Sequence, residues 1–375
     1  MGAATSSIAA KLAFFPPNPS YEIEKDERTG KLRLTGVTER DKGEVLMLRE
    51  LFNLFTKLSD QLGVNFMGSS FKRRWRKQHP FIKYFSYGSD FMWENIATGR
   101  FTNGKTITDF IADSIGLSYP IDFITEHEFT TKAGYNYASA SAGILPKTGS
   151  AFGETLRMKK QIDLFRETAR KHLPKFFETA EELSHYLSKS IFVIHIGSSD
   201  DIYNYIDSNH YDSSCLYNDE QFGELLVNEL GNHLKDLYNL VARKMIIFQI
   251  GPLGCLPYVI NRIKPKTRCA KDVNKMVSIL NQKLDVKLKE LSQMLDGSTI
   301  LTGQIYPPVK NMVENPINYG VTETRLPCCT IEENGLGLCK RFSPICPDRK
   351  SCLFWDELHT SLKIQIKFLQ SVALP

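Results

Sequence analysis

Apolar and polar positions alternate along most of the chain in the way that predicts strands followed by amphipathic helices. Residues 190–197 (SIFVIHIG) and 244–251 (KMIIFQIG) are continuous apolar runs that end in glycine. Such runs are typical of parallel strands buried on both faces. Residues 219–242 and 270–295 carry apolar side chains at helical spacing, and residues 298–306 form a third apolar run. This alternation predicts an α/β domain with a parallel sheet.

The first quarter of the chain has a different pattern. Residues 13–34 are rich in proline and charge, and a helical stretch and the short apolar run 63–68 (GVNFMG) follow. Beyond them we expect a helix at 104–116 and a pair of helices, interrupted by a proline, within 154–188. We therefore expect two parts: an N-terminal extension over residues 1–84 and an α/β domain over residues 85–375.

The charge pattern does not favour a nucleic-acid-binding protein. The net charge of +5 arises from 47 basic and 42 acidic residues, and the only dense basic run lies within residues 72–77. One short run of this kind is typical of a solvated loop, so no nucleic-acid partner is predicted. No apolar run reaches the roughly 18 residues that a transmembrane helix needs, so no transmembrane segment is expected.

The two ends of the chain suggest different compartments. The start MGAATS fits the N-myristoylation pattern, with Gly2 as the acceptor, and residues 8–15 are too short an apolar stretch for a signal peptide. These features favour a cytoplasmic or membrane-surface location. All eight cysteines lie at or after Cys215, in the manner of disulfides that close loops of a secreted protein.

Zinc is the competing interpretation of the cysteines. The sequence contains no Cys-x-x-Cys pair and no histidine at zinc-finger spacing, so no metal site is expected. We predict a bridge between Cys255 and Cys269 and a second cross-linked group, because long loops gain most from closure. The second group consists of Cys328, Cys329, Cys339 and Cys346. Two cysteines, Cys215 and Cys352, are expected to stay free.

The stretch LFWDELHTS places Asp356 three residues before His359. A carboxylate that orients an imidazole is two thirds of a catalytic triad, and the question is which residue is the nucleophile. His195 lies inside an apolar run, so we expect it to be a core histidine. Asp200 and Asp201 are expected to cap the next helix.

Several motifs resemble the plant branch of the GDSL, or SGNH, esterase/lipase family. They are YGSDF, TGRFTNGKTITDFIADSIGL, GYNYASASAGILPKTG, IHIGSSDDIYNYI, IGPLGCLPYV, CCTIEENGLGLC and CPDRKSCLFWDELHTS, in the family's order. The resemblance covers residues 85–375 and implies a flavodoxin-like α/β/α three-layer sandwich with a parallel sheet of about five strands. It also implies extracellular hydrolysis of small-molecule or lipid acyl esters without a cofactor.

Residue by residue, the resemblance assigns Asp356 and His359 to the catalytic pair. Its oxyanion positions fall on Ser141, where the family has glycine, and on Ser199, where it has asparagine. The family's first block, which carries the nucleophile, is not recognisable here. The nearest segment is NFMGSS, which makes Ser70 the candidate nucleophile and predicts that residues 63–68 replace the family's first strand.

Residues 1–68 resemble a fragment of a different family, the plant alpha/beta-hydrolase-domain proteins related to depalmitoylases, through MGAATSSIAAKLAFFPPNPSYEIEKDE and LSDQLGVNFMG. The chain is therefore expected to join two hydrolase fragments, neither of which contributes its serine. Three functions follow as alternatives: a GDSL-type carboxylic ester hydrolase with impaired catalysis, a non-catalytic binding protein that keeps the cleft, or an unproductive fusion.

Overall fold

The computed structural model describes most of the chain after residue 134 and shorter segments before it. The described residues are 22–25, 32–35, 64–68, 86–91, 98, 100–114, 117–122, 134–153, 155–207, 211–333, 335–362, 364 and 372–373. The chain divides into two compact units: Met1–Ser59 with Ser114–Gly116, and Asp60–Asp113 with Leu117–Pro375. In the first unit, β1 (Glu22–Lys25) and β2 (Leu32–Thr35) pair antiparallel.

The second unit contains a seven-stranded sheet in the order β11-β8-β7-β6-β3-β5-β4. Every neighbouring pair is parallel except β11 with β8. The strands are β3 (Val64–Gly68), β4 (Ile121–Asp122), β5 (Tyr135–Asn136), β6 (Ile191–His195), β7 (Lys244–Phe248), β8 (Thr299–Gly303) and β11 (Val372–Ala373). The three apolar runs predicted as parallel strands are β6, β7 and β8, which confirms the parallel α/β sheet.

Strand β3 lies in the middle of this sheet, between β6 and β5. It pairs with β6 along its whole length, from Val64 opposite Ile191 to Gly68 opposite His195. Asn65 and Met67, which point to the same face of the sheet because side chains alternate along a strand, are both buried. The prediction that residues 63–68 take the place of the first strand is therefore confirmed.

The helices follow the predicted periodicity. They are α3 (Ile107–Ser114), α4 (Met158–Glu167), α5 (Ala180–Lys189), α6 (Ser213–Leu216), α7 (Asp219–Asn239), α8 (Pro257–Ile263), α9 (Lys271–Met294) and α10 (Tyr306–Glu314). Between α4 and α5 the chain forms a π-helical turn, η2 (Thr168–His172), and a 3₁₀ turn, η3 (Leu173–Phe176). Pro174, whose ring does not fit a helix interior, therefore lies at the predicted interruption.

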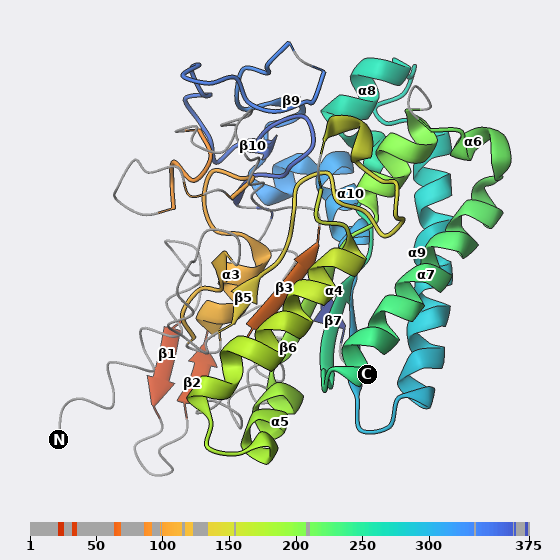
Figure 1. Ribbon diagram of the computed structural model, residues 1–375. Coiled ribbons are helices and arrows are strands. Elements are labelled where there is room, and N and C mark those ends of the chain that lie inside the picture. The colour runs from red at the N-terminus through yellow and green to blue at the C-terminus, as the bar shows by residue number, and fades with distance from the viewer. Residues whose placement is uncertain are drawn as a thin grey trace. The chain divides into compact units, whose positions relative to one another are not determined.

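Helix α7 illustrates how the sequence specifies its elements. Asn218 accepts a hydrogen bond from the Gln221 N–H while the Gln221 side chain accepts one from the Asn218 N–H, which is a capping box. Leu226, Leu230 and Leu234, at intervals of four residues, are buried. Helix α7 runs beside α9, whose own apolar face is buried over most of its length (Figure 1). This pair therefore contributes much of the core.

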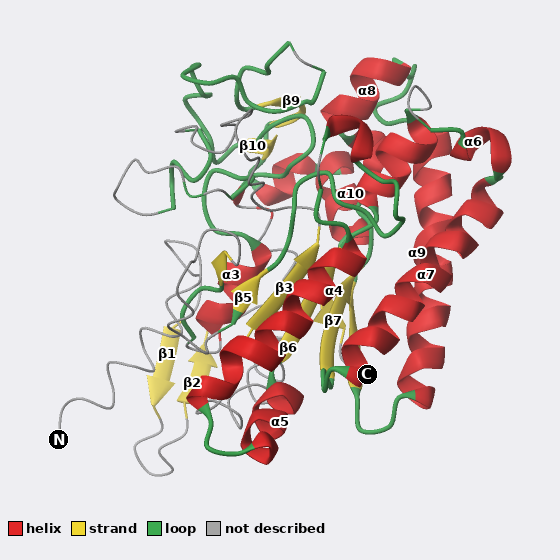
Figure 2. Cartoon of the chain, viewed as in Figure 1, coloured by secondary structure: helices red, strands yellow, loops and turns green. Residues whose placement is uncertain are grey.

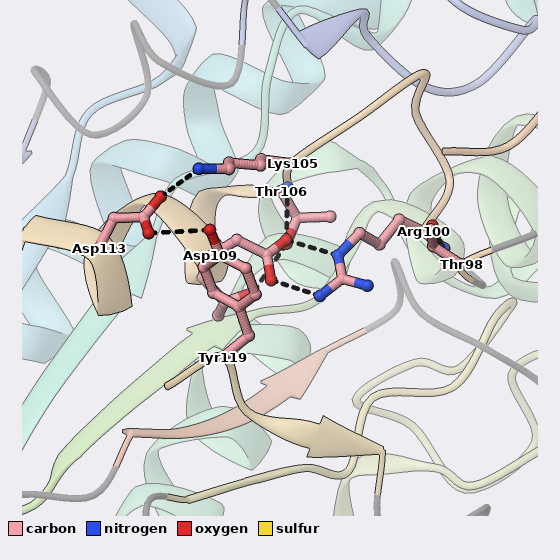
Figure 3. A network of polar contacts seen from close by, with 8 residues as sticks. Thr98, Arg100, Lys105, Thr106, Asp109, Asp113 and Tyr119 are labelled. Carbon is pink, nitrogen blue, oxygen red and sulfur yellow. Dashed lines mark hydrogen bonds and ion pairs between the residues drawn. The ribbon is translucent and has the colours of Figure 1, made fainter. Parts of the chain in front are cut away.

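A polar network fixes the segment before α3 (Figure 3). Arg100 donates through Nε and Nη2 to the two carboxylate oxygens of Asp109, at 2.7 and 2.6 Å. The backbone N–H and the hydroxyl of Thr106 donate to the same carboxylate, each at 2.8 Å. Lys105 and Tyr119 bind Asp113 at 2.7 and 2.9 Å. Bidentate arginine pairs fix orientation, so residues 100–106 form a rigid loop.

The last third of the second unit is a cross-linked region. Its bridges join Cys255 to Cys269, Cys328 to Cys346 and Cys329 to Cys339, while Cys215 and Cys352 are free thiols. The predicted grouping is confirmed. Two short parallel strands, β9 (Glu323–Pro327) and β10 (Cys352–Phe354), belong to this region. Figure 2 shows them, with the surrounding loops, beyond the end of the sheet toward which β3 points.

Within the described ranges, every helix is too short or too polar to cross a lipid bilayer. The predicted myristoylation site at Gly2 lies outside the described residues, so it stays a prediction. The η4 turn (Asp200–Ile206), which is π-helical, follows β6. The 3₁₀ turns η1 (Ser150–Phe152), η5 (Leu253–Cys255) and η6 (Pro316–Tyr319) complete the described elements.

Candidate active site

Asp356 is a fully buried carboxyl group surrounded by donors. Its Oδ1 accepts the backbone N–H groups of Leu358 and His359, at 2.8 and 2.7 Å. Its Oδ2 accepts the Tyr87 hydroxyl at 2.6 Å. The tight turn after β10 supplies the backbone donors, and Tyr87 reaches the carboxylate from a segment 269 residues earlier. A buried carboxylate needs such donors to offset its loss of hydration.

His359 completes the predicted pair. Its Nδ1 lies 2.8 Å from Oδ2 and 3.0 Å from Oδ1 of Asp356. Because a carboxylate only accepts hydrogen bonds, Nδ1 carries the proton and Nε2 holds a lone pair. No described residue hydrogen bonds with Nε2, and the imidazole is 18% exposed. The predicted contact between the two side chains is confirmed, and it leaves a basic nitrogen available.

The rigid loop at residues 100–106 supports the imidazole. The ring of Phe101 stacks on His359, with the centroids 4.8 Å apart and the planes 14° from parallel. The Asn103 side-chain oxygen accepts the Leu362 N–H at 2.8 Å, which ties this loop to the chain after His359. A Cβ on Gly104 would lie 2.8 Å from the end of the Leu362 side chain, so this loop packs closely against the residues that follow His359. These contacts hold His359 in one orientation.

His195 lies at the last position of β6, opposite the last residue of β3. Its ring packs edge-on against Phe248, with the centroids 5.9 Å apart. Burial lowers the pKa of His195 to about 4, and the charge of His359 acts in the same direction. His195 is half-buried, so the expectation of a core histidine is not met; it lies at the carboxyl edge of the sheet, near enough to His359 to sense its charge.

The two serines at the predicted oxyanion positions belong to segments that are joined by Asp200. Its carboxylate accepts the N–H groups of Ile144 and Leu145 at 2.8 and 3.0 Å, and the Thr148 hydroxyl at 2.6 Å. Ser199 is buried just before Asp200. Ser141 is half-buried, with φ at 58°, in the turn that leads to Ile144.

The expectation that Asp200 and Asp201 cap a helix is wrong. Ser199 occupies the N-cap position of η4, and its side chain makes no capping hydrogen bond. Both aspartates are buried inside η4 instead, and Asp200 binds a loop 52 to 56 residues earlier. Burial raises the pKa of Asp200 to about 6, against the effect of the Thr148, Leu145 and Ile144 hydrogen bonds. Burial, followed by the charge of Asp200, raises the pKa of Asp201 well above its ordinary value.

The candidate nucleophile, Ser70, lies outside the described residues. Strand β3 ends at Gly68, two positions before Ser70, and Gly68 lies opposite His195. Gly68 therefore lies at the carboxyl edge of the sheet. In open parallel sheets this edge carries the functional groups.

Among the described residues, one group of side chains could hold a metal ion. It consists of Cys328, Cys346 and Cys352, whose sulfur atoms all lie within 4.8 Å of one another. Two of these sulfurs are joined in a disulfide and offer no thiolate ligand. None of the three is part of the Asp356–His359 pair.

The parallel sheet and the hydrogen-bonded Asp356–His359 pair define an α/β protein of the SGNH-hydrolase class. The family model described as GDSL-like Lipase/Acylhydrolase matches residues 66–371, and the chain belongs to this family. It is 36% identical to GDSL esterase/lipase 7 of Arabidopsis thaliana over 281 residues, which are 74% of this chain and 76% of the relative. It is 35% identical to GDSL esterase/lipase At5g37690 of the same plant, over 73% of this chain and 76% of that protein.

Proposed function

We propose that the chain is a GDSL-type carboxylic ester hydrolase that keeps its acid–base pair but has impaired nucleophilic and oxyanion sites. The observation that carries this proposal is the orientation of His359. Its Nδ1 is bound to the buried Asp356, while Nε2 is left without a partner among the described residues. That arrangement suits a general base that takes a proton from a hydroxyl nucleophile.

The chemistry follows from the two nitrogens. Nε2 removes the proton of an attacking hydroxyl, and the imidazolium that forms is stabilised by Asp356, which keeps its own negative charge. The same proton is then delivered to the leaving alcohol as the acyl intermediate forms. Phe101, stacked on the ring, limits rotation of the imidazole during both transfers. Asp356 and His359 are thus proposed as catalytic residues.

The nucleophile and the oxyanion site are the two parts of the proposed active site that depart from the family pattern. Ser70 is the candidate nucleophile because it follows β3 by two residues, and the family match begins within that strand, at residue 66. The oxyanion positions carry Ser141 and Ser199, and a serine hydroxyl is shorter than the amide that the family resemblance implies at position 199. Removing one oxyanion donor costs about 10² to 10³ in turnover in a serine hydrolase. We therefore expect ester hydrolysis near background.

A non-catalytic binding protein is the second candidate. It is favoured by the same altered positions, Ser141 and Ser199, together with an acid–base pair that remains intact. Such a protein would bind an acyl ester or its carboxylic acid product beside His359 without turning it over. It differs from the first candidate in having no serine that an ester can acylate.

The substrate, the cellular location and the domain organisation are proposed as well. The substrate is a small-molecule or lipid acyl ester, with no cofactor or nucleic acid required. The three disulfides favour an oxidising compartment and hence an extracellular location, whereas the myristoylation pattern at Gly2 favours a cytoplasmic or membrane surface. Residues 1–84 are proposed as an extension of the hydrolase domain, which takes up residues 85–375.

Turnover of p-nitrophenyl butyrate and labelling by a fluorophosphonate test these proposals. We compare the unchanged chain with Ser70→Ala, His359→Ala and the matched control Ser69→Ala. Activity and labelling that vanish in Ser70→Ala and His359→Ala, and persist in Ser69→Ala, identify Ser70 as the nucleophile. Absence of labelling in every protein, with an acyl analogue still bound, supports the binding protein. Because labelling requires an activated serine but no turnover, it separates the two outcomes even where ester hydrolysis is near background.

A further inference from the structure

A free thiol lies against a disulfide in the cross-linked region. Cys352, the first residue of β10, is buried and has no disulfide partner. Its sulfur is 3.3 Å from that of Cys346, which is bonded to Cys328. All three sulfurs lie within 4.8 Å of one another. Cys346 therefore has two neighbours with which it can form a disulfide.

We propose that Cys346 and Cys352 form a second, alternative disulfide site, reached from the Cys328–Cys346 bridge by exchange inside the folded protein. The Cys352 thiol first loses its proton to solvent. Its thiolate attacks the Cys346 sulfur, the Cys346–Cys352 bond forms, and the Cys328–Cys346 bond breaks. Cys328 leaves as a thiolate and takes up a proton. The step consumes no oxidant or reductant, because one disulfide and one thiol are present before and after it.

The backbone holds the three cysteines together whichever pair is bonded. The Cys346 N–H donates to the Cys328 carbonyl at 2.7 Å. The Cys328 N–H donates to the carbonyls of Phe354 and Trp355, both at 3.1 Å, which ties it to the chain that follows Cys352. The Cys346–Cys352 separation of 3.3 Å has to shorten by about 1.2 Å to reach a bond length. Side-chain motion supplies a shift of that size without unfolding.

The surroundings of Cys352 set the pH dependence of the exchange. Burial raises the pKa of its thiol, and the carboxylates of Glu323 and Asp348 act in the same direction, while a hydrogen bond with Ser351 opposes them. Because the thiolate is the attacking species, exchange is slow near neutral pH and becomes faster as the pH rises. The Cys352 thiol therefore stays largely protonated and unreactive at neutral pH.

The exchange moves a cross-link onto the strand that leads to the candidate active site. The present bridge closes a loop of 18 residues between Cys328 and Cys346. The alternative bridge ties Cys346 to the first residue of β10, which continues directly into Trp355 and Asp356. Cys328 then becomes the free thiol of the cluster.

Disulfide mapping on the intact, oxidised chain tests the proposal. The protein is incubated at pH 7 and pH 9 without added thiol, quenched in acid, unfolded, alkylated with N-ethylmaleimide and digested with pepsin. We expect a Cys346–Cys352 peptide and alkylated Cys328, both more than fivefold more abundant at pH 9. The rate should be independent of protein concentration, because the reaction is intramolecular, and unchanged in the control Cys215→Ser, which removes the exposed free thiol.

Two variants check the same pair by a separate route. Cys328→Ser, refolded under oxidising conditions, should contain the Cys346–Cys352 bridge, whereas Cys352→Ser should keep Cys328–Cys346 at every pH. The proposal is overturned if Cys352 alone of the three is alkylated at both pH values. It is equally overturned if Cys346 and Cys352 are both alkylated in folded Cys328→Ser, which would make their contact simple packing.

Discussion

Asp356 and Asp201 are both buried aspartates, yet their surroundings differ sharply. The Asp356 carboxylate accepts two backbone N–H groups, a tyrosine hydroxyl and the His359 imidazole. By contrast, Oδ2 of Asp201 has no hydrogen-bond partner among the described residues. Burial, and after it the charge of the neighbouring Asp200 carboxylate, raises the pKa of Asp201.

This difference shows that burial by itself does not determine what a carboxyl group does. Donors that converge on Asp356 fix the orientation of His359, so the cost of burying the carboxylate is offset by hydrogen bonds that also build the site. Oδ2 of Asp201 has no such compensation among the described residues, and the raised pKa favours the neutral acid. One aspartate orients the His359 imidazole, whereas the other is expected to make stability depend on pH.

The largest expected effect is the loss of stability in Asp356→Ala. This change leaves the Tyr87 hydroxyl, two backbone N–H groups and the His359 Nδ1–H without their acceptor. We expect the free energy of unfolding to fall by about 3 to 5 kcal/mol, because unpaired buried donors are costly. Guanidinium unfolding followed by tryptophan fluorescence measures it.

Tyr87→Phe is the matched control for that change. It removes one donor to Asp356 and leaves the Cys339 N–H, which donates to the Tyr87 oxygen at 3.0 Å, without an acceptor. The expected loss is about 1 to 2 kcal/mol. Equal losses in the two variants would show that the tyrosine, and not the convergence of donors, stabilises this region.

Asp201→Asn should stabilise the protein, and more so as the pH rises. Because the folded-state pKa is raised, the unfolded chain releases this proton first, near the ordinary value of 3.8, while the folded protein retains it. The native protein therefore loses stability as the pH rises above that value, by up to about 1.4 kcal/mol per pH unit until the folded state also ionises. Asparagine does not titrate and avoids the loss.

Thermal unfolding at pH 4.5 and pH 7.5 measures this effect. The gain in Asp201→Asn should exceed about 1 kcal/mol at pH 7.5 and be smaller at pH 4.5. The surface control is Asp296→Asn, at an exposed position. A destabilised Asp201→Asn at pH 7.5 would refute the assignment of Asp201 as a neutral acid.

The sheet and its long helices could be predicted because their signals are local. The apolar runs 190–197, 244–251 and 298–306 contain β6, β7 and β8, and the periodicity of 219–242 contains α7. The Asp356–His359 contact was also predictable, since three residues separate the two. Strands β4 and β5, of two residues each, are too short to produce any pattern.

The hydrogen bonds that hold the side chains of the candidate site in place could not be predicted, because they join segments that are distant in the sequence. Tyr87 and Asp356 are 269 positions apart, and no spacing or motif connects them. The error at Asp200 has the same origin, since an aspartate before a helical stretch is typical of a cap. Its actual donors, Ile144 and Leu145, come from another part of the fold.

The smallest expected effect concerns the stacking of Phe101 on His359, which tests whether the imidazole is held as firmly as its carboxylate partner. Phe101 contacts His359 face to face and Tyr87 edge to face, at 4.8 and 5.2 Å between centroids. Aromatic pairs of this kind contribute about 0.5 to 1.5 kcal/mol beyond their buried area, so Phe101→Leu should lower the unfolding free energy by about 1 kcal/mol. The ring current of Phe101 should also shift the carbon-bound protons of His359 upfield in the NMR spectrum. Phe101→Leu should move them downfield, whereas Phe91→Leu, whose ring lies under Arg100, should leave them in place. Unchanged His359 resonances in Phe101→Leu would mean that the hydrogen bonds to Asp356 orient the imidazole without help from the aromatic ring.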